Sequence, residues 1–261
     1  MSNFALIGGS GIELLPLSQR KTITIETPYG TVQTEKGLLG GKEIAFINRH
    51  GTDHAFPPHL INYRANLWAL RELGVKKILA TAAMGSLSPK YHLKDLVLID
   101  QFLDFTKSRP QTFYEGGAQG VLHVDVTDPY CEQLRLVMAE AGAQLNLDIK
   151  NGATYVCTEG PRFETPAEIK MFQILGGELV GMTSVPEVIL ARELGICYAS
   201  LGIVTNEAAG IAAHRLTHAE VMEGIRTIEK SVFALIEKTM RMLTPEQNCT
   251  CALANLEIGR F

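Results

Sequence analysis

The chain has 261 residues, of which 46% are hydrophobic and 20% are charged, and its formal net charge is −4. This composition is typical of a soluble protein with a substantial core, and no basic block indicates a nucleic-acid surface. No apolar run reaches transmembrane length and no signal peptide is evident, so we expect a cytoplasmic protein without a membrane partner.

No linker divides the chain, and we expect one domain over residues 1–245 followed by a tail over residues 246–261. The five cysteines are odd in number and scattered, which does not indicate a disulfide framework. Cys249-Thr250-Cys251 is the one close pair. It is either a redox or weak metal site or, as we favour, an incidental pair of thiols.

Residues 4–7 predict a short buried strand that stops at Gly8-Gly9-Ser10-Gly11. A glycine turn exposes backbone N–H groups and Ser10 adds a hydroxyl, so this segment is either an anion cradle or a plain β-turn. It does not match a P-loop, and it lacks the third glycine of the dinucleotide fingerprint.

Residues 22–25 predict a strand and residues 37–47 a hairpin, whose second strand is followed by Arg49 and His50. The planar fork of an arginine suits phosphate, so these two residues and the Gly-Ser turn predict a two-sided phosphate site. The alternative for Arg49 is a surface ion pair. Three histidines lie between residues 50 and 59, but their spacing matches no zinc pattern and we predict no metal there.

The middle of the chain predicts further strands and helices in alternation. We expect a helix over residues 62–73, strands over residues 75–81 and 95–99, an irregular functional or interface loop over residues 104–120, a strand over residues 121–126 and a helix over residues 128–143. Ala83 lies among small residues that would allow a ligand near the backbone, and His123 is either a ligand group or an edge-strand histidine.

The second half places polar groups at strand ends. We expect strands over residues 153–157, 179–180 and 197–205, with helices over residues 166–175, 187–194 and 217–242. Phe163 and Glu164 follow the first of these strands, Met182 and Thr183 the second, and Asn206 the third. Ligands of open α/β sheets bind at such carboxyl ends.

The side chains around Phe163 and Glu164 suit a flat heterocycle that presents N–H donors. An aromatic ring stacks on a flat heterocycle, a carboxylate accepts from its N–H, and an amide both donates and accepts. Met182 and Thr183 suit a sugar and a phosphate. For Phe163 and Glu164 the alternative is an ordinary strand-to-helix turn.

Several blocks in this order resemble the trimeric branch of the purine nucleoside phosphorylase family, which includes the methylthioadenosine and methylthioinosine phosphorylases. The resemblance covers nearly the whole chain, and its blocks are Ile7-Gly8-Gly9-Ser10-Gly11, Arg49-His50-Gly51, Asn62-Tyr63-Arg64-Ala65-Asn66, Glu159-Gly160-Pro161-Arg162-Phe163-Glu164-Thr165 and Gly181-Met182-Thr183-Ser184-Val185-Pro186-Glu187. It implies a single-domain α/β fold with a central mixed, partly closed β-sheet flanked by helices. It also implies phosphorolysis of a purine nucleoside, with inorganic phosphate as co-substrate and no cofactor or metal.

The resemblance also implies roles for individual residues. Ser10, Arg49, His50, Ala83 and Thr183 would bind phosphate, Met182 would contact the ribose, and Phe163, Glu164 and Asn206 would bind the base. Asn206, Glu164 and Arg49 would take part in catalysis. His123 would reach the active site of the neighbouring subunit, which implies a homotrimer.

Two positions bear on the substrate. Adenine-specific relatives carry Asp where this chain has Asn206 and do not carry Glu at position 164, so we predict 6-oxopurine bases. His218 aligns with the residue that contacts the 5′ group and favours a hydroxyl, whereas residues 56–59 and 62–70 look closest to methylthioinosine enzymes. The 5′ group stays open, and the alternatives are a methylthioadenosine phosphorylase, a nucleoside hydrolase, a nucleotide-binding module and a nicotinamide-dependent enzyme.

Overall fold

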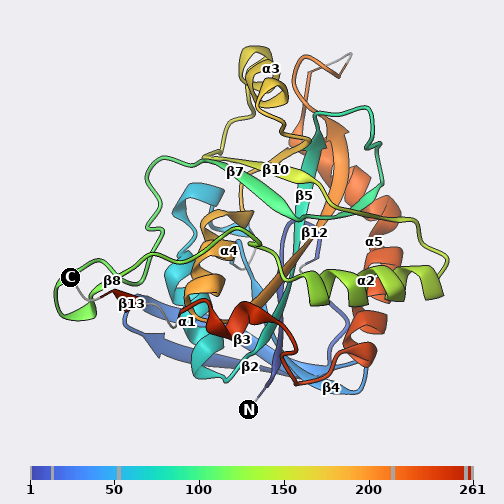
Figure 1. The fold of residues 1–261 in the computed structure, drawn as a ribbon. Coiled ribbons are helices and arrows are strands. Elements are labelled where there is room, and N and C mark those ends of the chain that lie inside the picture. Colours follow the sequence, from blue (N-terminus) through green and yellow to red (C-terminus); the bar gives the residue numbers. More distant parts are fainter. Residues whose placement is uncertain (1, 13–14, 52–53, 213–214, 256–257, 260–261) are drawn as a thin grey trace.

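The structure is a computed structural model that describes residues 2–12, 15–51, 54–212, 215–255 and 258–259 (Figure 1). Its strands are β1 (Phe4–Gly8), β2 (Ser18–Thr27), β3 (Gly30–Leu39), β4 (Lys42–Asn48), β5 (Lys77–Ser86), β6 (Leu96–Leu98), β7 (Gln101–Phe105), β8 (Val121–Leu122), β9 (Ile149–Asn151), β10 (Thr154–Thr158), β11 (Leu179–Gly181), β12 (Cys197–Glu207) and β13 (Ile258–Gly259). Its α-helices are α1 (Tyr63–Glu72), α2 (Glu132–Gln144), α3 (Pro166–Ile174), α4 (Ser184–Glu193) and α5 (His218–Met242).

A mixed sheet of eleven of these strands is the centre of the fold. Strands β4, β1, β5 and β12 run parallel, so their carboxyl ends meet at one edge of the sheet. β5 is the branch point, because it pairs with β1 near its start, with antiparallel β11 near its end, and with β12 along its length. β10 and β7 extend the sheet beyond β11. The expected mixed sheet flanked by helices is confirmed.

Helices cover both faces of the sheet (Figure 1). α1 and α4 pack together on one face, where Leu67 and Leu190 belong to one hydrophobic core. α2 and α5 pack on the other face, where Leu134 and Leu235 belong to a second core. A smaller cluster lies under α3 around Phe172. These cores pack the helices against the strands and so help to set the positions of the strand ends.

Some local expectations differ from the structure. The strand expected over residues 121–126 ends at Leu122, because Asp125 accepts hydrogen bonds from the backbone and hydroxyl of Thr127 and forms a turn instead. Strands β7 and β9 were not expected, since both are short and lie at sheet edges where their side chains are only partly buried. Among the described residues, no helix has both the length and the apolar character needed to cross a membrane.

Candidate active site

A cavity of about 360 Å³ opens where the carboxyl ends of the central strands meet. Nine of the predicted site residues line it, from seven separate segments of the chain: Ser10, His50, Ala83, Phe163, Glu164, Met182, Thr183, Asn206 and His218. Arg49 and His123 do not line it. The size suits a small ligand whose surface is mostly enclosed.

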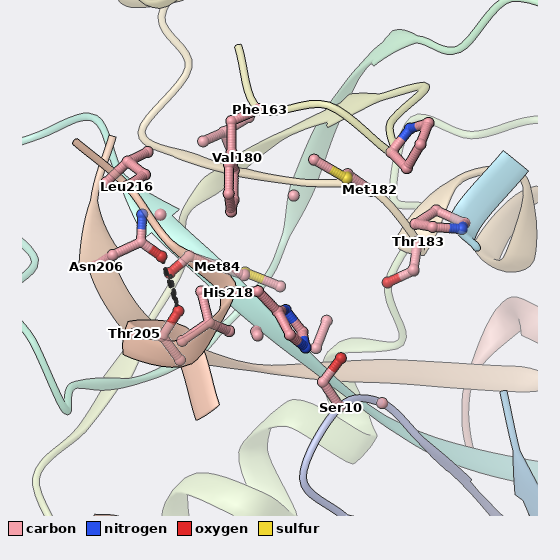
Figure 2. Close-up of a pocket in the computed structure, with 18 of the residues that line it drawn as sticks. Ser10, Met84, Phe163, Val180, Met182, Thr183, Thr205, Asn206, Leu216 and His218 are labelled. Atoms are coloured by element: carbon pink, nitrogen blue, oxygen red, sulfur yellow. Dashed lines mark hydrogen bonds between the residues drawn. The ribbon is translucent and has the colours of Figure 1, made fainter. Parts of the chain in front are cut away.

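The cavity has two chemically different ends. Figure 2 shows Phe163, Val180, Asn206 and Leu216 gathered at one end, and Ser10 and Thr183 at the other. Met182, Met84 and His218 lie between these ends (Figure 2). The arrangement can hold a flat polar ring at the first end and an anion at the second.

Glu164, next in the chain to Phe163, supplies a carboxylate to the lining of the cavity. It is 9% exposed, and its Oε1 accepts a hydrogen bond of 2.6 Å from the hydroxyl of Thr158 on β10. Burial raises the pKa of Glu164, and the hydrogen bond from Thr158 offsets only part of that rise. A carboxylate can accept about four hydrogen bonds, so Glu164 keeps acceptor capacity for a ligand N–H.

Asn206 supplies the amide of the ring end. Its Oδ1 accepts from the Thr205 hydroxyl at 2.9 Å, and its Nδ2 donates to the Glu207 carbonyl at 2.9 Å, which fixes the amide plane. A bulge between Val204 and Asn206 shifts the register of β12 at this point, and bulges commonly redirect a side chain. A Cβ on Gly85, the partner of Asn206 on β5, would lie 3.1 Å from Nδ2, so the glycine leaves room for the amide.

The anion end begins at the turn after β1. The Gly9 N–H donates to the Thr81 hydroxyl at 3.0 Å, and the Ser10 hydroxyl lies 3.1 Å from Nε2 of His54. The rings of His54 and His50 are stacked with centroids 4.4 Å apart. Nδ1 of His50 hydrogen-bonds the Phe56 carbonyl at 2.9 Å, which orients that ring. His54 is thus a cavity residue to which the sequence interpretation gave no role.

Arg49 lies directly behind the Gly9 turn rather than in the cavity. A Cβ on Gly9 would approach Nη1 of Arg49 to 3.0 Å, and the guanidinium is bound to Glu187 on α4 by two hydrogen bonds of 2.6 and 2.7 Å. The same Nη1 donates to the Thr81 carbonyl at 2.8 Å. Burial disfavours the charged guanidinium, but the Glu187 carboxylate more than offsets this, and the pKa of Arg49 is raised.

Sequence reasoning missed Arg109, which holds the loops around the cavity together. It is buried, and its guanidinium donates to the carbonyls of Thr158, Glu159, Met182 and Val185 at 2.7 to 3.1 Å. It therefore ties the strand end that carries Glu164 to the strand end that carries Met182. The local sequence does not indicate that Arg109 is buried, because an arginine in a polar loop ordinarily faces solvent.

His123 is exposed and follows β8, and it is not part of the cavity of its own chain. Its assignment to the site of a neighbouring subunit stays a prediction.

Comparison with known proteins gives the family. The sequence profile described as the phosphorylase superfamily matches residues 3–241. The 6-oxopurine nucleoside phosphorylase of Pyrococcus furiosus is 48% identical over 96% of this chain and 97% of its own. The probable S-methyl-5′-thioinosine phosphorylase of Methanopyrus kandleri is 50% identical over 97% of this chain and 98% of its own.

Solved structures agree with the sequence comparison. The methylthioadenosine phosphorylase from Schistosoma mansoni, in complex with adenine, is 31% identical and superposes with a TM-score of 0.91 over 99% of this chain and 97% of its own. With the profile match and the identities above, these likenesses show that this chain belongs to the phosphorylase superfamily, among its nucleoside phosphorylases.

Proposed function

We propose that the protein catalyses phosphorolysis of 6-oxopurine nucleosides, converting nucleoside and inorganic phosphate to free purine base and ribose 1-phosphate. The observation that carries the proposal is one cavity that is lined by both Glu164 and Asn206, with Asn206 at one end and Ser10 and Thr183 at the other (Figure 2). The names of the curated relatives, 6-oxopurine nucleoside phosphorylase and probable S-methyl-5′-thioinosine phosphorylase, support the same substrate class.

Base selection follows from donors and acceptors. A 6-oxopurine presents an N1–H donor and the O6 and N7 acceptors, which complement the Glu164 carboxylate and the second amide hydrogen of Asn206. Adenine presents an acceptor at N1 and a donor at its amino group. Its N1 would face the Glu164 carboxylate acceptor to acceptor, so the pair would reject adenine as well as accept hypoxanthine or guanine.

Bond cleavage gives the sugar oxocarbenium character and the leaving base negative charge. Phosphate held on one side of the ribose would attack the anomeric carbon and stabilise the developing cation. Asn206 would donate to the base, or accept from N7 once it is protonated, and so stabilise the leaving group. Met182, between the two ends of the cavity, would pack against the ribose. The proposal needs no cofactor and no covalent enzyme intermediate.

Phosphate would be bound by Ser10, His50, Thr183 and the backbone at Ala83, all of which line the cavity. Arg49 would act from behind the Gly9 turn through its remaining N–H groups, since its charge is already paired with Glu187. Arg49→Ala should then mainly raise the KM for phosphate, and an unaltered phosphate KM would remove Arg49 from this site.

We further propose that the protein is a homotrimer in which His123 reaches the cavity of the neighbouring subunit. The exposure of His123 and its position outside its own cavity support this assignment.

The experiment is a base-release assay on inosine, adenosine, methylthioinosine and methylthioadenosine, each with and without phosphate. Phosphate-dependent release from the two 6-oxopurine substrates alone is the expected result, and their ratio gives the preferred 5′ group at His218. Release from the adenine pair instead would overturn the base assignment, and release without phosphate would identify a hydrolase.

A further inference from the structure

Four of the five cysteines lie close together in the structure, although Cys131 and Cys197 are far in sequence from Cys249 and Cys251. Cys131 directly precedes α2, Cys197 is the first residue of β12, and Cys249 and Cys251 lie at the start of the 3₁₀ helix Thr250–Leu253. Their four sulfur atoms all lie within 4.8 Å of one another. The Sγ of Cys249 is 3.8 Å from that of Cys131 and 3.3 Å from that of Cys197.

These separations match a tetrahedral metal site. Zinc bound by four thiolates at about 2.3 Å places the sulfurs about 3.8 Å apart, and four-cysteine sites of this kind are closed structural sites. We propose that Cys131, Cys197, Cys249 and Cys251 bind one Zn²⁺ ion. Each thiol would release its proton to solvent as its sulfur–zinc bond forms, and no oxidation or reduction takes place.

The groups around the cluster favour thiolates. Nη1 of the buried Arg192 donates to Sγ of Cys251 at 3.5 Å, and Nε2 of Gln247 donates to Sγ of Cys197 at 3.2 Å. A zinc ion with four thiolates carries two negative charges, which the arginine and the helix N-terminus partly offset.

The position of the cluster indicates a structural role. Cys197 begins β12 and Asn206 lies near its end, so at about 3.3 Å per residue the cluster is about 30 Å from the base-binding residues. Gln247 also hydrogen-bonds the carbonyls of Lys76 and Gly195. A bound ion would therefore fasten the segment after α5 to the start of the central strands.

This inference replaces the interpretation of Cys249 and Cys251 as incidental thiols. Their spacing is shorter than the usual C-x₂₋₄-C of zinc sites, and Cys131 and Cys197 lie 118 and 52 residues before Cys249. Only the fold brings the four together.

The test measures the zinc content of the full-length protein. The protein is first reduced and dialysed against a buffer that contains zinc, and unbound zinc is then removed by gel filtration. We expect about one zinc per chain in the wild type and less than about a tenth of that in Cys249→Ser, whose side chain is only half-buried. Cys157→Ala is the matched control, because the fifth cysteine is buried outside the cluster, and it should keep its zinc. When cobalt replaces zinc in the dialysis, the wild type and Cys157→Ala should show the absorption bands of tetrahedral thiolate coordination, and Cys249→Ser should not.

A second measurement separates the metal from folding. A strong chelator should lower the Tm of the wild type and of Cys157→Ala, while the Tm of Cys249→Ser should not respond. The turnover of inosine at moderate temperature should be the same with and without the chelator. The proposal would be overturned if the reduced wild type bound no zinc, or if Cys249→Ser bound as much zinc as the wild type. It would also be overturned if the mass of the native protein were lower by four hydrogens, because the four cysteines would then form two disulfides.

Discussion

Two polar side chains of the cavity, Glu164 and Asn206, are each held by the hydroxyl of a nearby threonine. Thr158 donates to Glu164 at 2.6 Å, and Thr205 donates to Asn206 at 2.9 Å. Both threonines are buried, so the two contacts are formed without competition from solvent. A site whose donors and acceptors are already oriented loses little order when it binds the transition state.

The buried Glu164 should give the reaction an acidic limb. An ordinary glutamate has a pKa of about 4.3. Burial raises the pKa of Glu164, so this carboxylate takes up a proton at a higher pH than an ordinary glutamate does. The kcat/KM for inosine should fall as the pH drops through this raised pKa, since the protonated carboxyl is a weaker acceptor of N1–H. Glu164→Gln should lower kcat/KM about 10- to 100-fold and remove the limb. The exposed Glu72→Gln is the control, and a limb that persists in Glu164→Gln would contradict the assignment.

The same carboxyl should affect stability with a definite sign. A group whose pKa is raised in the folded state stabilises the fold fully below its unfolded pKa, and this contribution is lost as the pH rises through the folded value. Glu164→Gln should therefore raise Tm at neutral pH and change it little at low pH.

Base preference should follow the pair rather than either residue. Asn206→Asp combined with Glu164→Ser replaces a donor by an acceptor and removes the carboxylate that faces N1. We expect turnover of inosine to fall at least about 10-fold and adenosine to gain relative to inosine. The ratio of kcat/KM for the two nucleosides is the measurement. An unchanged ratio would show that this pair does not select the base.

At the scale of elements, the site depends on strand ends that are connected by buried charges. Arg109 ties β10 to β11 through carbonyl groups, and Arg49 with Glu187 ties the end of β4 to α4. Arginine suits both positions, because its rigid fork reaches several acceptors at once.

Arg109→Lys should loosen the nucleoside side of the cavity more than the phosphate side. Lysine has fewer donors and cannot reach the same four carbonyls, two of which lie beside the segments that carry Glu164 and Met182. We expect the KM for inosine to rise about 10-fold while the KM for phosphate changes little. Arg241→Lys, an exposed pair with Glu237, is the control. An equal rise in both KM values would indicate general damage to the fold.

The buried pair of Arg49 and Glu187 should be essential for stability. Glu187 is fully buried and also accepts from the Tyr198 hydroxyl, so Glu187→Gln leaves a guanidinium buried without its counter-charge. The free energy of unfolding should fall by about 3–5 kcal/mol. Denaturant unfolding measures this, with Glu237→Gln at the exposed pair expected to cost less than about 1 kcal/mol. Equal losses in the two variants would contradict the prediction.

At the scale of the whole molecule, the proposed trimer can be tested by complementation. Light scattering should give about three times the chain mass of 28.6 kDa. His123→Ala and Asn206→Ala should each have low activity alone. When the two variants are refolded together, activity should rise, because a chain with an intact Asn206 then receives His123 from a neighbour. No gain on mixing, with trimers formed, would remove His123 from the neighbouring site.

Local patterns in the sequence determined most strands and helices, short edge strands such as β7 and β9 excepted, and the polar residues at the strand ends. Strand ends are marked by glycine and polar residues within a few positions, and parallel strands bring those ends together whatever the detailed packing. This is why eight of the nine predicted residues from scattered segments line one cavity, whereas His218, on α5, was predicted only through the family resemblance.

Only the tertiary structure decided the partners of the buried groups. The ion pair of Arg49 spans 138 residues, Arg109 reaches carbonyls up to 76 residues away, and Cys131 meets Cys249 across 118 residues. A buried charge or thiol depends on a partner. The packing of whole elements decides which residue is that partner, and the local sequence around either residue does not indicate the pairing.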